Sequence, residues 1–472
     1  MVFASLSFLL IFFPISLLVY ILCPNIGMKN FVLILFSILF YSWGEPVWVF
    51  LLLFTTLIDF QMAKLIEKYI DNSKAKLCLW ISIGLSLGSL IFFKYSGFLV
   101  ENFSFFTGIN IQCPKVDLPI GISFYTFQSI SYMVDVYNGK VKAQRDYSKY
   151  LLFISLFHQL VAGPIVRYTD IEKEISSRSV SWKDISYGVD RFVWGLFKKV
   201  FFANTAAVLV DSCFERDLSS LTVAECIFGL VMFAIQLYYD FSGYSDMAIG
   251  MGRMIGFTYD ENFNFPYASK SIKEFWSRWH ISLGTFLRDY LFNPIAFKRK
   301  KWGKFALVYS LIITFFVSGL WHGASWNFVF WGLYFAFLII IEEWFLTGFL
   351  KKLGAWAQHT YLILAVIFSY TFFYFVDFHK MVEFLTVLFQ AKTPWYNEDI
   401  INILLNHGVW LIVSVFFLFP WGNQILNYGI QKWNVNRSAI GAVRFVVNLC
   451  LLCVAISLLV AKSYNPFLYF RF

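Results

Sequence analysis

His322 is the residue whose type and position most directly suggest chemistry. It lies in an apolar stretch, residues 315–330, within the run Val-Ser-Gly-Leu-Trp-His-Gly-Ala-Ser-Trp-Asn. An ionisable side chain at membrane depth is costly, and it usually lies in a water-filled cavity or on a substrate path. A neutral imidazole there can take a proton from a hydroxyl group as a general base. On this stretch alone, a histidine hydrogen-bonded to a neighbouring carbonyl is an equally good interpretation.

The other histidines offer one further candidate and no metal site. His280 and His158 lie in or beside apolar segments, whereas the remaining three lie near the ends of apolar spans, where solvated roles are expected. No H-x-x-x-H or H-E-x-x-H spacing occurs, so we expect neither a zinc hydrolase nor another metal site. The G-x-S-x-G motif of serine hydrolases is absent as well.

A second polar group lies in the tract Gln-Leu-Tyr-Tyr-Asp-Phe-Ser-Gly-Tyr-Ser-Asp. Gln236 and Asp240 share one face of a helix, and Asp246 follows just after a glycine. Acidic side chains in such a segment are expected to project into the bundle and away from lipid. They could form a structural pair with Arg253 or a histidine. They could equally orient an imidazole or line a polar tunnel.

Composition defines the scaffold that positions these residues. The 472 residues are 59% hydrophobic and 14% charged, and the mean hydropathy is +0.65. Such a chain is expected to be an all-α, polytopic membrane protein and not a soluble one. The net charge of +9 comes from short scattered basic clusters, so nucleic acid is not an expected partner. The predicted spans are residues 3–22, 30–43, 46–62, 77–93, 150–165, 187–209, 224–239, 305–320, 328–346, 361–376, 408–419 and 443–460.

The distribution of lysine and arginine predicts an orientation. Basic loops at residues 64–76, 270–304, 351–352 and 432–444 should be cytoplasmic. Counting outward from these loops places both termini outside, and it places His322 near the outer end of a hairpin. The first span lacks the features of a cleaved signal peptide.

Three segments are predicted to depart from simple spans. Residues 118–136 and 241–267 are apolar but interrupted by glycine, proline, serine and aspartate, which favours non-helical backbone lining a cavity. Residues 269–304 are too charged to span, yet their apolar positions recur at helical spacing. This pattern predicts an amphipathic helix at the cytoplasmic interface. It could anchor the bundle to anionic lipid or bind an acidic thioester donor.

The chain resembles the membrane-bound O-acyltransferase family, specifically the branch with the membrane components of alginate and peptidoglycan O-acetylation. The resemblance rests on several tracts that occur in order over most of the chain. They are Leu-Pro-Ile-Gly-Ile-Ser-Phe-Tyr-Thr-Phe-Gln at 118–128, Val-Ala-Gly-Pro-Ile-Val-Arg at 161–167, residues 236–256, Asn-Phe-Pro-Tyr at 264–267, Phe-Trp-Ser-Arg-Trp-His-Ile-Ser-Leu at 275–283, and Gly-Leu-Trp-His-Gly at 319–323.

The resemblance implies one membrane-embedded domain over residues 1–472, built as a ring of about a dozen transmembrane or re-entrant helices around a tunnel. It implies that His322 is the histidine most closely tied to acyl transfer and that His280 is its upstream partner. His158 departs from the related pattern and is expected to be structural. Acetyl-CoA is the implied donor and enters from the cytoplasm, and no cofactor is expected to stay bound. The implied partner is an extracytoplasmic SGNH-type or similar acetyltransferase that modifies a polysaccharide.

These roles suit the residue types. His322 would act as general base, and His280 would position donor or substrate. The tunnel-lining or orienting candidates are Gln236, Asp240, Asp246, Trp321 and Asn327; Asn327 is also a candidate for oxyanion stabilisation.

The last residues, 462–472, form an aromatic tail that is expected outside. It resembles the C-terminal aromatic motif of the small partner in teichoic-acid D-alanylation. Tyr469 could therefore accept the acyl group and pass it on, although an interfacial aromatic anchor is at least as good an interpretation. Two other functions stay open: D-alanyl transfer to teichoic acid, and a transporter or flippase with polar residues in broken helices.

Overall fold

The structure is a computed structural model that describes residues 2–112, 116–161, 163–390, 392–433, 436–461 and 467–468. Its contacts divide the chain into two compact units. Unit 1 comprises Met1–Phe192 and Tyr244–Glu261, and unit 2 comprises Val193–Gly243 and Asn262–Phe472. The two units share two helices, α9 (Trp182–Phe197) and α11 (Val223–Met254).

Unit 1 is helical throughout its described elements. Besides its parts of α9 and α11, it contains η1 (Phe8–Phe12), α1 (Phe13–Leu22), α2 (Ile26–Gly44), α3 (Trp48–Lys68), α4 (Ser73–Thr107), α5 (Ile122–Tyr137), α6 (Tyr147–Ser155), α7 (Phe157–Leu160) and α8 (Tyr168–Ser176).

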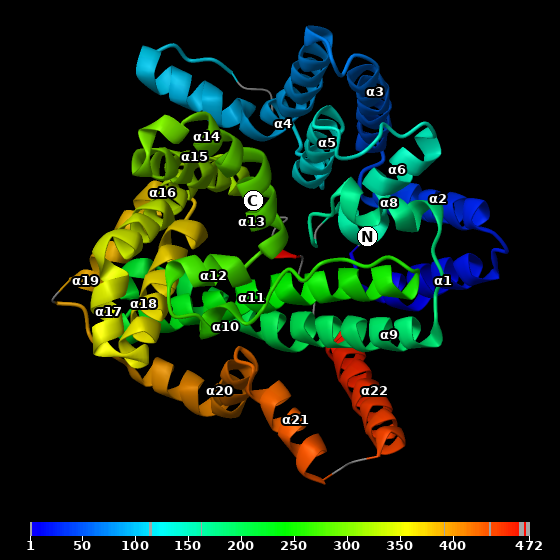
Figure 1. Ribbon diagram of the computed structural model, residues 1–472. Helices are drawn as coiled ribbons and strands as arrows, with labels where there is room; N and C mark the ends of the chain where they lie inside the picture. The colour runs from blue at the N-terminus through cyan, green and yellow to red at the C-terminus, as the bar shows by residue number, and fades with distance from the viewer. Residues whose placement is uncertain are drawn as a thin grey trace. The chain divides into compact units, whose positions relative to one another are not determined.

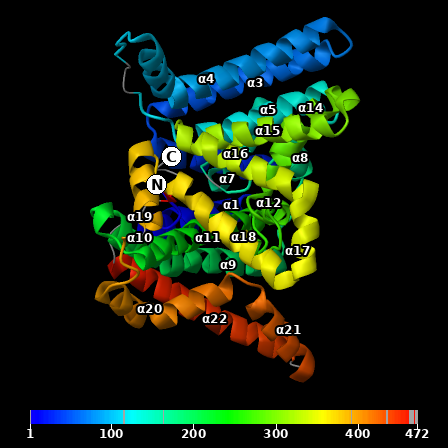
Figure 2. The same ribbon diagram turned by 90° about the vertical axis from the view of Figure 1, so that its left-hand side faces the viewer.

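Unit 2 carries the tracts around both candidate catalytic histidines. Its remaining elements are η2 (Lys198–Ala203), α10 (Asn204–Phe214), η3 (Leu218–Ser220), η4 (Pro266–Ala268), α12 (Ile272–Arg278), α13 (Ile281–Leu287), η5 (Arg288–Phe292), α14 (Asn293–Lys298), η6 (Lys300–Trp302), α15 (Lys304–His322), α16 (Trp326–Ile341), η7 (Glu342–Leu346), α17 (Thr347–Leu353), α18 (Ala355–Tyr374), α19 (Phe378–Phe389), α20 (Glu398–Phe417), α21 (Trp421–Trp433) and α22 (Arg437–Ala461). In Figure 2, α20, α21 and α22 lie together at the bottom of the view.

Nine helices of the described chain are long and apolar enough to cross a membrane, and a shorter apolar helix covers Phe8–Leu22. Eleven of the twelve predicted spans lie on helices for most of their length. The span predicted over residues 150–165 is wrong: it consists of two short helices, α6 and α7, separated at Leu156, and residues 163–165 are not helical. Hydrocarbon offers no hydrogen bonds to the backbone, so an apolar chain of this kind satisfies its peptide groups within helices. The chain is a multi-pass membrane protein.

The prediction of non-helical backbone in residues 118–136 and 241–267 is wrong for most of both segments. Helix α5 begins at Ile122, and α11 continues without interruption to Met254. The glycines of α11 serve close packing instead of breaking the helix. A Cβ atom on Gly250 would lie 2.6 Å from the carbonyl oxygen of Gly188 in α9, so this glycine is a site of close helix packing.

Helices α15 and α16 form a closely packed hairpin that places His322 at its turn, and they run side by side in Figures 1 and 2. A Cβ atom on Gly319 would lie 2.3 Å from the Phe328 carbonyl oxygen, and one on Gly332 would lie 2.2 Å from the Phe315 carbonyl oxygen. Only glycine permits this approach of the two backbones. Gly319 of the Gly-Leu-Trp-His-Gly tract and Gly332 of α16 therefore let the two helices pack closely next to His322.

The amphipathic segment 269–304 is several short helices and not one. Helix α12 ends at Arg278, and α13 begins at Ile281 after a turn at His280. Its apolar positions Ile272, Phe275 and Trp279 are buried in the core of unit 2. The helical periodicity therefore reflects burial inside the protein, while the cytoplasmic location of the segment stays a prediction.

Candidate active site

His280 is held in a specific backbone conformation between α12 and α13. Its φ is 44° and its ψ is 55°, the left-handed region that non-glycine residues adopt uncommonly. The residues before and after it pair with the segment at 262–264. The amide of Ile281 donates to the carbonyl of Asn262 at 3.0 Å, and the amide of Asn264 donates to the carbonyl of Arg278 at 2.9 Å. This pairing accounts for the turn that interrupts the helix.

The Asn262 side chain fixes the tautomer of His280. Asn262 Oδ1 accepts from the Ser282 backbone amide at 3.3 Å and from the Ser282 hydroxyl at 2.9 Å. Because an amide N–H can only donate, this atom is an acceptor, so His280 Nδ1, 3.0 Å away, carries the hydrogen. The proton-free nitrogen is then Nε2. This atom is buried and has no hydrogen-bond partner.

Burial also fixes the charge of His280. The side chain is 1% exposed, and removal from solvent lowers its pKa to about 3. The imidazole is therefore neutral near pH 7. A neutral ring with an unpartnered Nε2 can accept a hydrogen bond or a proton at that atom.

A cavity of about 330 Å³ opens beside His280. It is lined mainly by apolar side chains of α12, α13 and α15, with Arg288 and Ser318 among its polar residues. Trp276 also lines it, and the buried Trp276 Nε1 has no hydrogen-bond partner. Two residues that line the cavity, Trp276 and His280, thus each have a buried polar atom without a hydrogen-bond partner. We call this space the His280 cavity.

His322 is connected to the same group through aromatic contacts. The Trp321 ring lies 5.9 Å from the His280 ring and 4.9 Å from the His322 ring, measured between centroids. Trp331 and Phe373 contact the His322 imidazole edge to face at 4.8 and 5.1 Å. Ser318 lines the His280 cavity, and His322 follows it four residues later on the same face of α15. Both histidines and Trp321 therefore belong to one buried cluster.

Asp240 is buried, and its two carboxylate oxygens contact a lysine and a backbone amide. Its Oδ1 forms an ion pair with Lys199 Nζ at 2.6 Å. Its Oδ2 accepts the backbone amide of Leu468, from the far end of the chain, at 2.7 Å. The next residue, Phe241, contacts the His280 ring at 4.6 Å and the Phe467 ring at 5.8 Å. Asp240 therefore links the end of the chain to the histidine cluster.

The other acidic and amide candidates occupy different environments. Gln236 is buried one turn before Asp240 on α11. Asp246 belongs to unit 1 and pairs with Arg191, whose Nε lies 2.8 Å from its Oδ1. The Asn327 side-chain amide donates to the carbonyl of Phe375, so it ties α16 to the end of α18. Roles for these residues in substrate binding stay predictions.

His158 and Tyr469 complete the set of predicted residues. His158 is fully buried in unit 1, where its Nδ1 lies 3.0 Å from the Tyr259 hydroxyl. This contact fits the structural role that we expect for it. Tyr469 lies outside the described residues, directly after Leu468. Across the described ranges, no group of three or more histidine, cysteine, aspartate or glutamate side chains could hold a metal ion.

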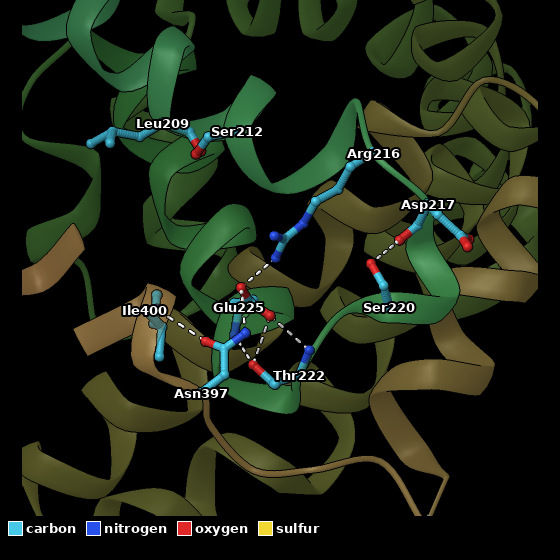
Figure 3. A network of polar contacts seen from close by, with 9 residues as sticks. All are labelled: Leu209, Ser212, Arg216, Asp217, Ser220, Thr222, Glu225, Asn397 and Ile400. Carbon is cyan, nitrogen blue, oxygen red and sulfur yellow. Dashed lines mark hydrogen bonds and ion pairs between the residues drawn. The ribbon is translucent and has the colours of Figure 1, made fainter. Parts of the chain in front are cut away.

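A second cavity, of about 760 Å³, lies at the ends of α10 and α18. We call it the vestibule. Buried Phe375 and Leu468 line it, as do six charged residues: Glu215, Arg216, Asp217, Asp377, Lys380 and Glu383. Arg216 is held by the buried Glu225, whose carboxylate also accepts from Thr222 and Asn397 (Figure 3). The position of at least one charge on the vestibule wall is therefore fixed.

Sequence reasoning missed three residues of the site. Lys199 and Asn262 lie outside the motifs that drew attention, and Leu468 is one residue before the predicted relay. A lysine in an apolar span was a usable signal for Lys199, because buried lysines need a partner. Asn262 precedes the Asn-Phe-Pro-Tyr tract by two residues, and only the turn at His280 shows its role.

Comparison with known proteins defines the class. Residues 144–368 match the membrane-bound O-acyltransferase family, and this chain belongs to that family. It is therefore an acyltransferase, and this membership excludes the alternative of a transporter or flippase.

Several named relatives extend over most of the chain. A probable alginate O-acetylase AlgI of Pseudomonas putida is 40% identical over 348 residues, covering 73% of this chain and 71% of the relative. A peptidoglycan O-acetyltransferase of Helicobacter pylori is 32% identical over 359 residues, covering 69% and 67%. A teichoic acid D-alanyltransferase of Bacillus subtilis is 30% identical over 264 residues, covering 54% and 66%.

Proposed function

We propose that this enzyme transfers an acetyl group from a cytoplasmic thioester across the membrane for O-acetylation of an extracytoplasmic polysaccharide. The observation that carries the proposal is the neutral His280, whose proton-free Nε2 belongs to a residue lining a 330 Å³ cavity. Trp321 connects this ring to His322. The relatives named for alginate and peptidoglycan O-acetylation support a polysaccharide as the final acceptor.

Acetyl-CoA is the proposed donor, and the His280 cavity is its proposed binding site. The apolar walls suit a thioester arm, and Arg288 at the wall suits an anionic or amide group of the donor. The basic run Lys298–Lys304 follows shortly after and would attract the donor's phosphates from the cytoplasmic side. His280 would position the thioester, and Trp276 Nε1 would donate to its carbonyl oxygen.

The reaction needs no group beyond donor, acceptor and imidazole. An imidazole nitrogen of His322 takes the proton of the acceptor hydroxyl while the hydroxyl oxygen attacks the thioester carbonyl carbon. The carbon–sulfur bond of the resulting tetrahedral intermediate breaks. An ester forms, and the thiolate leaves and takes the proton from the imidazolium. Hydrogen-bond donors at the carbonyl oxygen lower the barrier because negative charge develops there.

The final acceptor of the acetyl group lies outside the cell in this proposal. We place the enzyme in a bacterial plasma membrane with both termini outside, and an SGNH-type or similar transferase there would carry the acetyl group to the polysaccharide. Tyr469 is the proposed relay between His322 and this partner. Its neighbours Phe467 and Leu468 contact Phe241 and Asp240, which supports an approach of the tail to the cluster.

D-alanyl transfer to teichoic acid is the second candidate, supported by the relative from Bacillus subtilis. The acetylating relatives have higher identity and cover more of this chain, so acetyl transfer is the favoured function.

The experiment supplies membranes with acetyl-CoA or with a D-alanyl carrier thioester, each labelled on the acyl group, and follows label in protein and glycan. We expect label only from acetyl-CoA, loss of label with His322→Ala, and loss of transfer to the partner with Tyr469→Phe. Label from the D-alanyl carrier alone would select the second candidate. Unchanged acetylation with Tyr469→Phe would exclude the relay.

A further inference from the structure

We propose that the ion pair between Lys199 and Asp240 is an anchor for the C-terminal segment, and that both are positioning residues for the residues that follow Leu468. The anchor itself is independent of the reaction. Its significance for acyl transfer rests on the function proposed above.

The burial of the ion pair between Lys199 and Asp240 is not explained by protein stability alone. The Lys199 and Asp240 residues are 4% and 1% exposed, and their charged atoms lie 2.6 Å apart. Burying two charges costs about as much free energy as their attraction returns, so such a pair is weak evidence for a stabilising role. A charged carboxylate is, however, a stronger acceptor for a backbone amide than a neutral group.

The second carboxylate oxygen of Asp240 explains the buried charge, because it binds a backbone amide near the C-terminus. Asp240 Oδ2 accepts the amide of Leu468 at 2.7 Å, across a sequence separation of 228 residues. Lys199 compensates the charge of Asp240 from the opposite oxygen, so the carboxylate can remain ionised while it binds the amide. Leu468 and Phe467 are both buried. Phe467 and Leu468 are therefore held by a specific polar contact as well as by apolar packing.

The local sequence brings the lysine to this position. Lys199 lies in η2, a wide helical turn of the kind often found at functional sites. A Cβ atom on Gly243 would lie 2.7 Å from the Gly195 carbonyl oxygen and 3.2 Å from the Lys199 amide nitrogen. Glycine at position 243 thus lets α11 approach η2 closely enough for the two charges to meet.

The anchored residues lie between the histidine cluster and the vestibule. Phe467 contacts Phe241, which contacts His280, whereas Leu468 lines the vestibule.

The test is hydrogen–deuterium exchange of the C-terminal peptide in the purified full-length protein. We expect a slowly exchanging amide in the wild type. Asp240→Leu removes both contacts and should accelerate that exchange at least about tenfold, because a hydrogen bond to a charged group is lost. Asp240→Asn retains an acceptor oxygen and should give an intermediate rate. Lys199→Met should also accelerate exchange.

Controls separate the anchor from misfolding and from loss of activity. Lys198→Met alters the neighbouring lysine, which lies over the Trp194 and Tyr238 rings, and should leave the C-terminal peptide protected. Peptides from α15 should exchange as in the wild type in every variant. His322→Ala should keep the C-terminal amide protected, so failure of the proposed chemistry would not affect this result. Wild-type exchange of the C-terminal peptide in Asp240→Leu would overturn the proposal.

A second pair of variants tests the amide itself. Leu468→Pro removes the N–H group that Asp240 accepts, whereas Leu468→Ala keeps it. If the anchor positions the tail for transfer, Leu468→Pro should lower acetyl transfer at least about tenfold relative to Leu468→Ala. Equal activities of these two variants would contradict the positioning role.

Discussion

His280 Nδ1 lies 3.0 Å from Asn262 Oδ1, an oxygen that also accepts from Ser282. This relationship determines which imidazole nitrogen is free of hydrogen. The free Nε2 is buried on a residue that lines the His280 cavity. An asparagine 18 residues earlier in the chain thus sets the chemical state of a candidate active-site histidine.

Asn262→Ala should lower acyl transfer about 10- to 100-fold, because loss of the orienting partner frees the imidazole to change tautomer. Ser282→Ala should have a smaller effect, since His280 keeps its hydrogen bond to Asn262. Steady-state transfer rates of the purified variants measure this difference. Asn262→Ala activity equal to that of the wild type would mean that the tautomer is not fixed by this contact.

Stability should decrease as the pH falls from about 6.5 toward 3. Burial lowers the pKa of His280 to about 3, and burial together with Arg178 lowers the pKa of His158 to about 3. Below pH 6.5 the unfolded chain binds protons at these residues while the folded protein does not, so protonation favours unfolding. We expect the Tm of the wild type to fall between pH 7 and pH 4.5.

Measuring Tm against pH in variants shows which histidines cause the loss of stability at low pH. His280→Gln and His158→Gln should each flatten the dependence of Tm on pH, whatever they do to Tm at pH 7. The matched control is His379→Gln, because His379 is exposed; its slope should equal that of the wild type. Identical slopes in all four proteins would contradict the assigned pKa values.

Gly319→Ala and Gly332→Ala should each destabilise the protein by about 1–3 kcal/mol, because the added methyl group collides with a backbone carbonyl of the facing helix. Gly348→Ala is the matched control, since its Cβ would meet nothing within 4 Å. At that position alanine should be neutral or stabilising by up to about 1 kcal/mol, as expected from helix propensity. Thermal unfolding in detergent measures all three. A Tm loss in Gly348→Ala as large as in the other two would show that close packing is not the cause.

Gly284→Leu should raise KM for the thioester donor at least about tenfold, or about 1.4 kcal/mol, by filling part of the His280 cavity. The position has room, because an added Cβ would have its nearest neighbour at 3.7 Å. The variant should therefore keep the wild-type Tm. Gly348→Leu, away from the cavity, should leave KM unchanged. Normal KM with Gly284→Leu would place the donor elsewhere.

Much of the fold could be predicted because lipid imposes a simple rule on the sequence. The length of apolar stretches predicted the spans, and every predicted span except residues 150–165 lies on a helix for most of its length. Glycine was the main source of error. The glycine, proline, serine and aspartate residues of 241–267 predicted broken backbone, yet Gly243 and Gly250 permit close packing within an uninterrupted helix. Sequence alone does not distinguish a glycine that ends a helix from one that brings two helices together.

The site could be predicted only in part. Residue type and motif selected His280 and His322, and the structure places both in one aromatic cluster with Trp321. The partners of Asp240 could not be predicted, because Lys199 lies 41 residues before it and Leu468 lies 228 residues after it. Contacts of this range depend on how helices pack, and helical periodicity carries no such information. Asp240 accordingly contacts the tail, where an orienting contact to an imidazole was one expected role.

The most direct test of the central claim is the rate of acetyl transfer by the purified protein from labelled acetyl-CoA, compared between wild type, His322→Gln and His322→Ala. If His322 takes the acceptor proton, both variants should lose about 10²- to 10⁴-fold in rate while keeping the wild-type Tm. His280→Gln should also lose activity, with a rise in KM for the donor. Full transfer activity in a correctly folded His322→Ala protein would contradict the account.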